Sequence, residues 1–249
     1  MDFDASTTML LILLQNAAFV GVTLGAFWGG VFALRGFGRR LSFSLRPLGI
    51  VRPPQGVART VALGFGAGLA AIVLSAVLTA ASRYGLRALG YPAEGSAQQP
   101  FMDGISSWVS QSPAVAIPLV FLVVGLLTPA AEEVLFRGGI FGGLNRLFLA
   151  LSEKMTRWRT TDATDGELEA APRHASKGAA FAVSAGLSSA VFASLHLEPI
   201  IFLSIFTLAV GLCWLRSRSG LLAPIAAHAT FNSFTVSVLV LGGLGVLPG

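Results

Sequence analysis

The stretch Ala130-Ala131-Glu132-Glu133-Val134-Leu135-Phe136-Arg137 lies inside an apolar run that extends from Pro113 to Leu151. It sets two carboxylates and a guanidinium in sequence that is otherwise hydrophobic enough for a membrane interior. Ionisable groups at that depth are energetically costly, and they usually face the inside of a helical bundle or a water-filled cavity. The stretch therefore predicts a membrane-embedded helix that carries a functional polar site.

The two glutamates of this stretch have different neighbours on a helix. Glu133 and Arg137 have i,i+4 spacing, so their side chains lie on the same face and can form an ion pair. Glu132 is rotated by about 100° from Glu133 and needs other partners. One ion pair would be enough to lock two helices together, so the second carboxylate is interpreted as functional. We expect Glu133 and Arg137 to support the site and Glu132 to take part in chemistry.

The composition of the chain is that of a polytopic membrane protein. Of its 249 residues, 54% are hydrophobic and 12% are charged, and the mean hydropathy is +0.74, which excludes an ordinary soluble domain. The net charge of +5 does not indicate nucleic-acid binding, because aromatic residues are not interleaved with the basic ones. Cys213 is the single cysteine, so an intrachain disulfide is excluded. We predict one integral membrane domain over residues 1–249, multi-pass, in the cell membrane.

The apolar runs predict an all-α bundle of about six transmembrane spans around a polar cavity. The predicted spans are Thr8 to Leu34, Val57 to Ala81, Pro113 to Leu151, Gly178 to Leu195, Ile200 to Leu215 and Leu221 to Leu241. The first is too long for the core of a signal peptide and is expected to be retained. The third is longer than the about 20 residues that one span needs. Thr128-Pro129 is its expected break, since threonine can cap a helix and proline is tolerated in the first turn. Glu132 and Glu133 would then lie near a helix N-terminus.

Glycines at four-residue spacing predict where helices approach each other closely. Such stripes occur at Gly21, Gly25 and Gly29, at Gly64 and Gly68, and at Gly138 and Gly142. We expect each stripe to be a helix-packing surface.

The distribution of basic residues predicts the orientation in the membrane. Nearly all of the 17 lysines and arginines lie in or next to the loops after the first, third and fifth spans. Because cytoplasmic loops are enriched in Lys and Arg, residues 35–59 and 152–177 are expected inside, the latter as a solvated loop. Both chain termini and residues 82–112, an expected external loop with amphipathic pieces, would then lie outside.

Two more polar clusters occur in apolar sequence further along the chain. Phe192-Ala193-Ser194-Leu195-His196 ends at a histidine, and His228-Ala229-Thr230-Phe231-Asn232 begins at one. His228 and Asn232 share one helix face, whereas His196 taken alone could equally be a core histidine bonded to a carbonyl. Together with Glu132, these clusters supply a carboxylate, two imidazoles and an amide, which is the set that hydrolysis of a buried amide bond requires.

The motifs Glu-Glu-x-x-x-Arg, Phe-x-x-x-His and His-x-x-x-Asn, in that order, resemble those of the CPBP intramembrane protease family. That family comprises type II CAAX prenyl endopeptidases and bacteriocin-processing or bacteriocin-immunity relatives. The resemblance covers residues 113–241, the motif-bearing core, and implies a glutamate-dependent endopeptidase acting on a membrane-associated or prenylated peptide or protein. It implies that Glu132 and His196 activate water and that His228 and Asn232 stabilise the oxyanion.

The depth of His196 conflicts with a shared site. If the fourth helix begins at Gly178, His196 lies about 27 Å along it, near the face opposite to Glu132 and His228. The three motifs meet only if that helix begins earlier or is strongly tilted.

Glu132, His196 and His228 are also candidate metal ligands. Two histidines and a glutamate are a reasonable zinc set, and members of the family are often labelled metalloproteases. The sequence has no His-Glu-x-x-His motif, and the mechanism above requires no metal. The cofactor therefore stays open, with zinc as the candidate.

Two other functions would use the same residues. One is a non-catalytic bacteriocin-immunity or scaffold protein that binds a partner through the cavity. The other is a small transporter with Glu132, Glu133 and the histidines as a proton relay, although no clear two-fold repeat with paired broken helices supports it. Intact motifs permit turnover without distinguishing a protease from an immunity factor.

Single cysteines test the predicted orientation. In a Cys213→Ser background, cysteines are placed one at a time at Ser44, Ser96 and Thr164 and treated with a membrane-impermeant maleimide added outside the cell. We expect labelling only at position 96, because the other two positions lie in the basic loops. Labelling at position 164 would reverse the orientation.

Overall fold

A computed structural model describes residues 5–38, 40–91, 98–161 and 173–247, and these residues form helices and connections without a β-strand. The helices are α1 (Ala5–Gly36), η1 (Arg46–Leu48), α2 (Val57–Ala88), α3 (Gln99–Gln111), α4 (Pro113–Val120), η2 (Phe121–Leu127), α5 (Thr128–Glu133), η3 (Val134–Phe141), α6 (Gly142–Thr161), α7 (Arg173–Ser194), α8 (Pro199–Ser219) and α9 (Leu222–Gly243). The fold is an all-α membrane bundle, as the sequence predicts.

Five helical stretches in the described part of the chain are long and apolar enough to cross a membrane. They are Thr7–Gly36, Val57–Ala88, Pro113–Met155, Pro199–Ser219 and Leu222–Gly243. The predicted fourth span, α7, is not among them, because basic residues, serines and glycines are interspersed among its apolar residues. It packs instead against α6, η3 and α8 and turns three buried serines inward: Ser184, Ser188 and Ser189.

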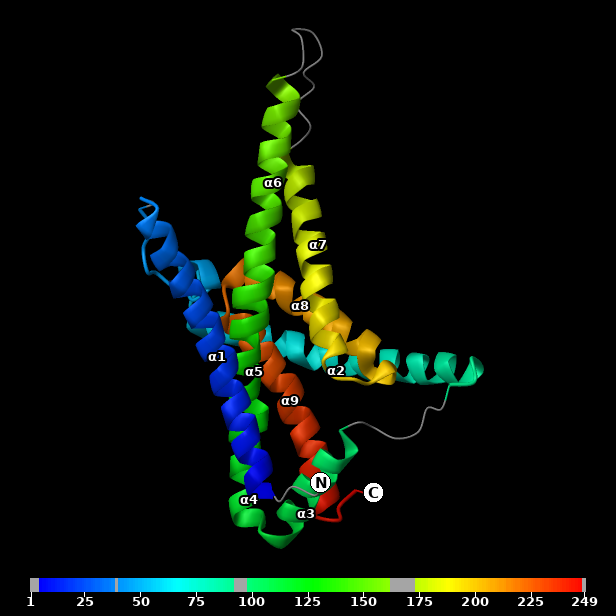
Figure 1. The fold of residues 1–249 in the computed structure, drawn as a ribbon. Helices are drawn as coiled ribbons and strands as arrows, with labels where there is room; N and C mark the ends of the chain where they lie inside the picture. The colour runs from blue at the N-terminus through cyan, green and yellow to red at the C-terminus, as the bar shows by residue number, and fades with distance from the viewer. Residues whose placement is uncertain (1–4, 39, 92–97, 162–172, 248–249) are drawn as a thin grey trace.

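The run from Pro113 to Thr161 is one continuous helix, visible as the long green rod in Figure 1. The predicted break at Thr128-Pro129 is wrong, since Leu127 and Thr128 both have helical backbone angles. In the π-helical stretch η2, the backbone N–H of Thr128 donates to the carbonyl of Val123, and its hydroxyl donates to the same oxygen at 3.0 Å. The wider π turn accommodates Pro129, which lacks an N–H and would clash with a carbonyl of a regular α-helix.

The continuity of this helix changes the setting of Glu132 and Glu133. Both lie in mid-helix, between the π-helical stretches η2 and η3, and not near an N-terminus as expected from the sequence. The helix dipole acts only within the terminal turns, so it does not act on these carboxylates. At 1.5 Å per residue the helix is about 70 Å long, and it extends well beyond the about 30 Å of bilayer hydrocarbon.

Other helices surround the central rod. α1 packs along α5 and η3 (Figure 1), where Asn16 Nδ2 donates to Thr128 Oγ1 at 3.0 Å. α9 packs against η2, α5 and α3, and α2 packs against α8 and α9. α1 begins and α9 ends at the same end of the molecule (Figure 1), which agrees with the expectation that both termini lie on one side.

The glycine stripe of α2 is a helix-packing surface, as predicted. An ideal Cβ at Gly64 would lie 2.5 Å from the carbonyl oxygen of Ala223, and one at Gly68 would lie 2.6 Å from that of Ala227. Only glycine permits backbones to approach this closely. The stripe brings α2 against the segment of α9 that carries His228.

The glycine stripe of α1 behaves differently. No described atom lies within 4 Å of the Cβ positions at Gly21, Gly25 or Gly29, so the predicted packing is wrong for contacts within this chain. In the central helix the prediction holds in part. A Cβ at Gly138 would lie 3.0 Å from the carbonyl oxygen of Leu48, whereas one at Gly142 would lie 3.0 Å from the side-chain atom Arg216 Nη2.

Two predicted loops contain helix. α3 lies in the expected external loop, and its buried Ile105 and Val109 make it the amphipathic piece that was anticipated. In the expected solvated loop at residues 152–177, α6 continues to Thr161 and α7 begins at Arg173, while residues 162–172 lie outside the described part.

Alanine substitutions test the contact between α2 and α9. Gly68→Ala is expected to lower the free energy of unfolding by about 1–3 kcal/mol, because the new methyl group must displace the backbone of α9. Gly66→Ala, on the same helix, has no described atom within 4 Å of its Cβ and should be neutral or stabilising by up to about 1 kcal/mol. Thermal unfolding in detergent compares the two. Equal effects would contradict the packing.

Candidate active site

The three polar motifs meet around one cavity of about 860 Å³, which we call the polar cavity. Its polar lining includes Glu132 from α5, His196 after α7, and His228 and Asn232 from α9. α7 begins at Arg173, before Gly178, which is one of the two conditions under which His196 can reach the other motifs. The four residues predicted to carry the chemistry therefore share one cavity.

Glu133 lies beside this cavity at the centre of a fully buried charge network. Its Oε1 accepts a hydrogen bond from His228 Nδ1 at 2.9 Å and lies 2.9 Å from Arg137 Nη1. Glu133 is 0% exposed and Arg137 is 1% exposed, so bulk water screens neither charge. The i,i+4 ion pair predicted from the sequence is confirmed. The network also ties α9 to the central helix.

Phe192 connects Arg137 with both histidines. The Arg137 guanidinium carbon lies 4.5 Å from the centroid of the Phe192 ring, a cation–π contact. The ring meets His196 and His228 edge-on, with centroid separations of 5.1 and 5.7 Å. One buried aromatic ring therefore fixes the positions of the cation and the two imidazoles.

Glu132 faces the polar cavity and is 15% exposed. Its Oε2 lies 3.5 Å from His228 Nε2, so the histidine expected to stabilise an oxyanion is also the nearest basic group to the expected general base. His228 Nδ1 carries a proton, because the Glu133 oxygen that it faces can only accept. If His228 Nε2 and Glu132 share one further proton, the net charge of the two glutamates, Arg137 and His228 is zero.

His196 is positioned by the end of α7. Its Nδ1 lies 3.0 Å from the carbonyl oxygen of Phe192. Since a carbonyl accepts only, Nδ1 is the protonated nitrogen, and Nε2 of the neutral ring carries the lone pair. The next residue, Leu197, has φ of +56° and is the only non-glycine residue with positive φ in the described ranges. Such a conformation persists only where its surroundings hold it, and it is common next to functional residues.

Asn232 is bound to the π-helical stretch η2. Its Nδ2 donates to the carbonyl oxygen of Val124 at 3.3 Å. The side-chain amide has two N–H donors, so this bond uses one and leaves the other for the cavity. The π geometry at η2 therefore helps to position an amide that the sequence places on another helix.

The predicted metal ligands do not fit a metal ion. Across the residues that the structure describes, no three His, Cys, Asp or Glu side chains are grouped as a metal site. Glu132 Oε2 and His228 Nε2 lie 3.5 Å apart, and no third ligand completes the group with them in the described ranges. The label metalloprotease is therefore not supported, and no step below involves a metal.

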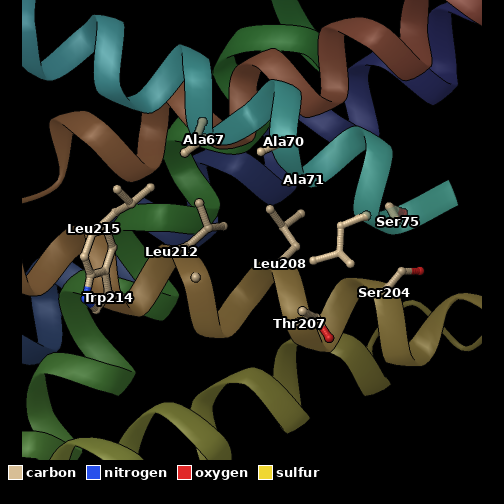
Figure 2. Close-up of a pocket in the computed structure, with 13 residues that line it drawn as sticks. Ala67, Ala70, Ala71, Ser75, Ser204, Thr207, Leu208, Leu212, Trp214 and Leu215 are labelled. Atoms are coloured by element: carbon tan, nitrogen blue, oxygen red, sulfur yellow. The ribbon is translucent and has the colours of Figure 1, made fainter. Parts of the chain in front are cut away.

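An apolar groove of about 250 Å³ lies beside the polar cavity. Figure 2 shows Ala67, Ala70 and Ala71 of α2 facing Leu208 and Leu212 of α8 across this groove. Ser75 and Ser204 line both the groove and the polar cavity, so the two spaces adjoin at these serines. We call this space the α2–α8 groove.

Asn16 is not among the residues predicted to form the site. It is a buried amide in an otherwise apolar span, 7% exposed, and its bond to Thr128 fixes α1 against the rim of the polar cavity. A polar amide within a membrane span is a signal for interhelical hydrogen bonding. The importance of Asn16 could therefore be predicted from the sequence, whereas its partner could be identified only in the structure.

Comparison with protein families supports the resemblance drawn from the motifs. A family model described as "Type II CAAX prenyl endopeptidase Rce1-like" matches residues 114–234, a range that contains all three motifs. Comparison with curated proteins and with solved structures found no match. The matched family is one of CAAX-type intramembrane proteases.

Substitutions that remove the charge but keep the shape of the side chain test the different roles of the two glutamates. Glu133→Gln is expected to lower stability by about 3–5 kcal/mol, because it leaves the buried Arg137 without its counter-ion. Glu132→Gln is expected to cost less, since Glu132 borders the cavity and its one described partner, His228, lies 3.5 Å away. Thermal unfolding and the yield of folded protein measure both. If Glu132→Gln is the more destabilising, this division of roles is wrong.

Proposed function

We propose that the Rce1-like type II CAAX prenyl endopeptidase domain at residues 114–234 is an active, glutamate-dependent intramembrane endopeptidase. One observation carries the proposal: two adjacent carboxylates have different surroundings. Glu133 is held by Arg137 and His228, whereas Glu132 faces the polar cavity. A purely structural ion-pair network would need only the first.

Glu132 is the proposed general base. Its carboxylate takes a proton from a water molecule in the polar cavity, and the water oxygen attacks the carbonyl carbon of the scissile peptide bond. The lone pair on His196 Nε2 orients this water or shares its proton. The same proton then passes to the nitrogen of the leaving amine when the carbon–nitrogen bond breaks.

His228 and Asn232 are the proposed oxyanion donors. When Glu132 is ionised, the shared proton resides on His228 Nε2, and this N–H together with the second amide N–H of Asn232 can donate to the developing negative oxygen. Glu133 and Arg137 act indirectly, because they fix the imidazole of His228 through its Nδ1. Preorganised donors of this kind need no reorientation during the reaction.

The α2–α8 groove favours a substrate with a hydrocarbon chain. Its lining is mainly alanine and leucine, and it adjoins the polar cavity at Ser75 and Ser204. A prenyl or similar chain in the groove would place the attached peptide next to Glu132. We propose a membrane-associated or prenylated peptide or protein in the cell membrane as the substrate.

Side-chain replacements test the proposed catalytic residues. Purified protein is incubated with fluorogenic peptides, each with and without a prenyl group. Glu132→Gln, His196→Ala and His228→Ala are expected to abolish cleavage, because water activation and oxyanion stabilisation serve one transition state. Asn232→Ala should lower kcat by about 10²–10³-fold, the usual effect of losing one oxyanion donor. We expect prenylated peptides to have the lower KM.

Asp103→Asn is the matched control, because it converts an exposed carboxylate outside the polar cavity to an amide. It should cleave as fast as the wild type. The protease function would be rejected in favour of the immunity or scaffold function by two results together: the wild type cleaves no substrate, and the Glu132 and His228 variants protect cells from a bacteriocin as well as the wild type does.

A further inference from the structure

Arg146 and Arg216 form a pair of like charges outside the polar cavity. Arg146 Nη1 donates to the carbonyl oxygen of Pro47 at 2.6 Å, and Arg216 Nη2 donates to the same oxygen at 3.0 Å. The arginines belong to α6 and α8, and Pro47 belongs to η1. Two guanidinium groups from helices far apart in the sequence therefore converge on one acceptor.

Because Gly142 has no side chain, the two guanidinium groups can occupy the space next to it. An ideal Cβ at this position would lie 3.0 Å from Arg216 Nη2 and 3.5 Å from Arg146 Nη1. Both positive groups thus lie over the same backbone atom and close to each other. Like charges at such short range repel, and the repulsion is stronger where water is partly excluded.

No acidic side chain compensates these charges in the part of the chain that the structure describes. The ion pairs found there are those of Arg137 and His228 with Glu132 and Glu133. Arg216 Nε is buried and has no hydrogen-bond partner among the described residues. Each guanidinium has five N–H donors, and one shared carbonyl oxygen satisfies few of them. An anion with several oxygens would supply the missing acceptors.

The surroundings hold this arrangement in place. The Arg216 guanidinium carbon lies 5.7 Å from the centroid of the Phe141 ring. The η1 turn ends at Gly49, with φ of +87°, whose carbonyl oxygen accepts a hydrogen bond from the Leu221 N–H at 2.9 Å. The shared acceptor is therefore fixed against the connection between α8 and α9, and the two arginines need little reorganisation to bind a ligand.

The central helix is long enough to place the pair outside the bilayer hydrocarbon, among the lipid headgroups. The segment from Pro113 to Asn145 is about 50 Å long at 1.5 Å per residue, which exceeds the about 30 Å of bilayer hydrocarbon. Arg216 lies in the last turn of α8, next to Arg218. Arginine forks match the oxygens of a phosphate group.

We propose that Arg146 and Arg216 bind a phosphate group at the membrane surface. The ligand chemistry is that of a phosphate monoanion or dianion, which either the headgroup of an anionic phospholipid or free inorganic phosphate can supply. The site is separate from the polar cavity, so it does not depend on the proposed peptidase activity.

Melting temperatures of the purified full-length protein test this site. In one arm, nanodiscs of phosphatidylcholine alone are compared with nanodiscs that also contain phosphatidylglycerol. In the other arm, inorganic phosphate replaces chloride at equal ionic strength in phosphatidylcholine nanodiscs. For the wild type we expect a rise of about 3 °C or more in at least one arm. A rise only with phosphatidylglycerol identifies a lipid headgroup, and a rise with inorganic phosphate identifies free phosphate as a ligand.

Arg146→Gln and Arg216→Gln are expected to lose at least half of that rise. Arg218→Gln is the matched control: its guanidinium carbon lies 5.3 Å from the Trp214 ring, and the variant should keep the full rise. Arg146 is exposed, so Arg146→Gln should fold. The result for this variant is sufficient for the test even if Arg216→Gln does not fold. The proposal is overturned if neither arm stabilises the wild type, or if Arg218→Gln loses as much of the rise as Arg146→Gln.

Discussion

The buried carboxylate of Glu133 determines how this bundle can assemble. A charge with no access to water is tolerated only when its partners are in place, and here the partners come from η3 and α9. The central helix and α9 must therefore dock together to neutralise it. Phe192 extends the same dependence to α7, because its ring packs on Arg137 and on the histidines. Folding of the membrane bundle and formation of the polar cavity are thus one event.

Close backbone contact has a similar role on the other side of α9. Gly64 and Gly68 allow α2 to lie directly on the turns of α9 that precede and carry His228. His228 is then held from two directions, by a charge network on one face and by glycine packing on another. A bilayer provides little hydrophobic driving force between helices, so packing and polar bonds of this kind must supply the specificity.

Much of this arrangement could be predicted from local spacing. The i,i+4 spacing of Glu133 and Arg137 predicts their ion pair, and the apolar composition predicts an all-α membrane fold. The unbroken helix through Pro129 could not be foreseen, because it depends on a shift of backbone hydrogen bonds in η2 that no residue type encodes. The glycines of α1 show the opposite failure, since a small-residue stripe does not specify its partner. The bond of Asn232 to Val124 and the early start of α7 depend on tertiary packing.

The π-helical stretches on either side of Glu132 also determine where this segment can vary in length. A π turn holds more residues than an α turn, and one residue corresponds to about 100° of rotation in an α-helix. A π turn therefore absorbs one extra residue. Deleting that residue and returning the stretch to α geometry would keep the side chains on either side in phase, whereas deleting a residue from an α-helical part would turn every side chain beyond it by about 100°. The face with Val120 and Val123 packs in the core near α3, α4 and α9, whereas Gly138 meets η1. The phase between these contacts therefore survives the loss of one residue from η2 or η3, and single-residue deletions should be tolerated in these two stretches more readily than in α5 between them.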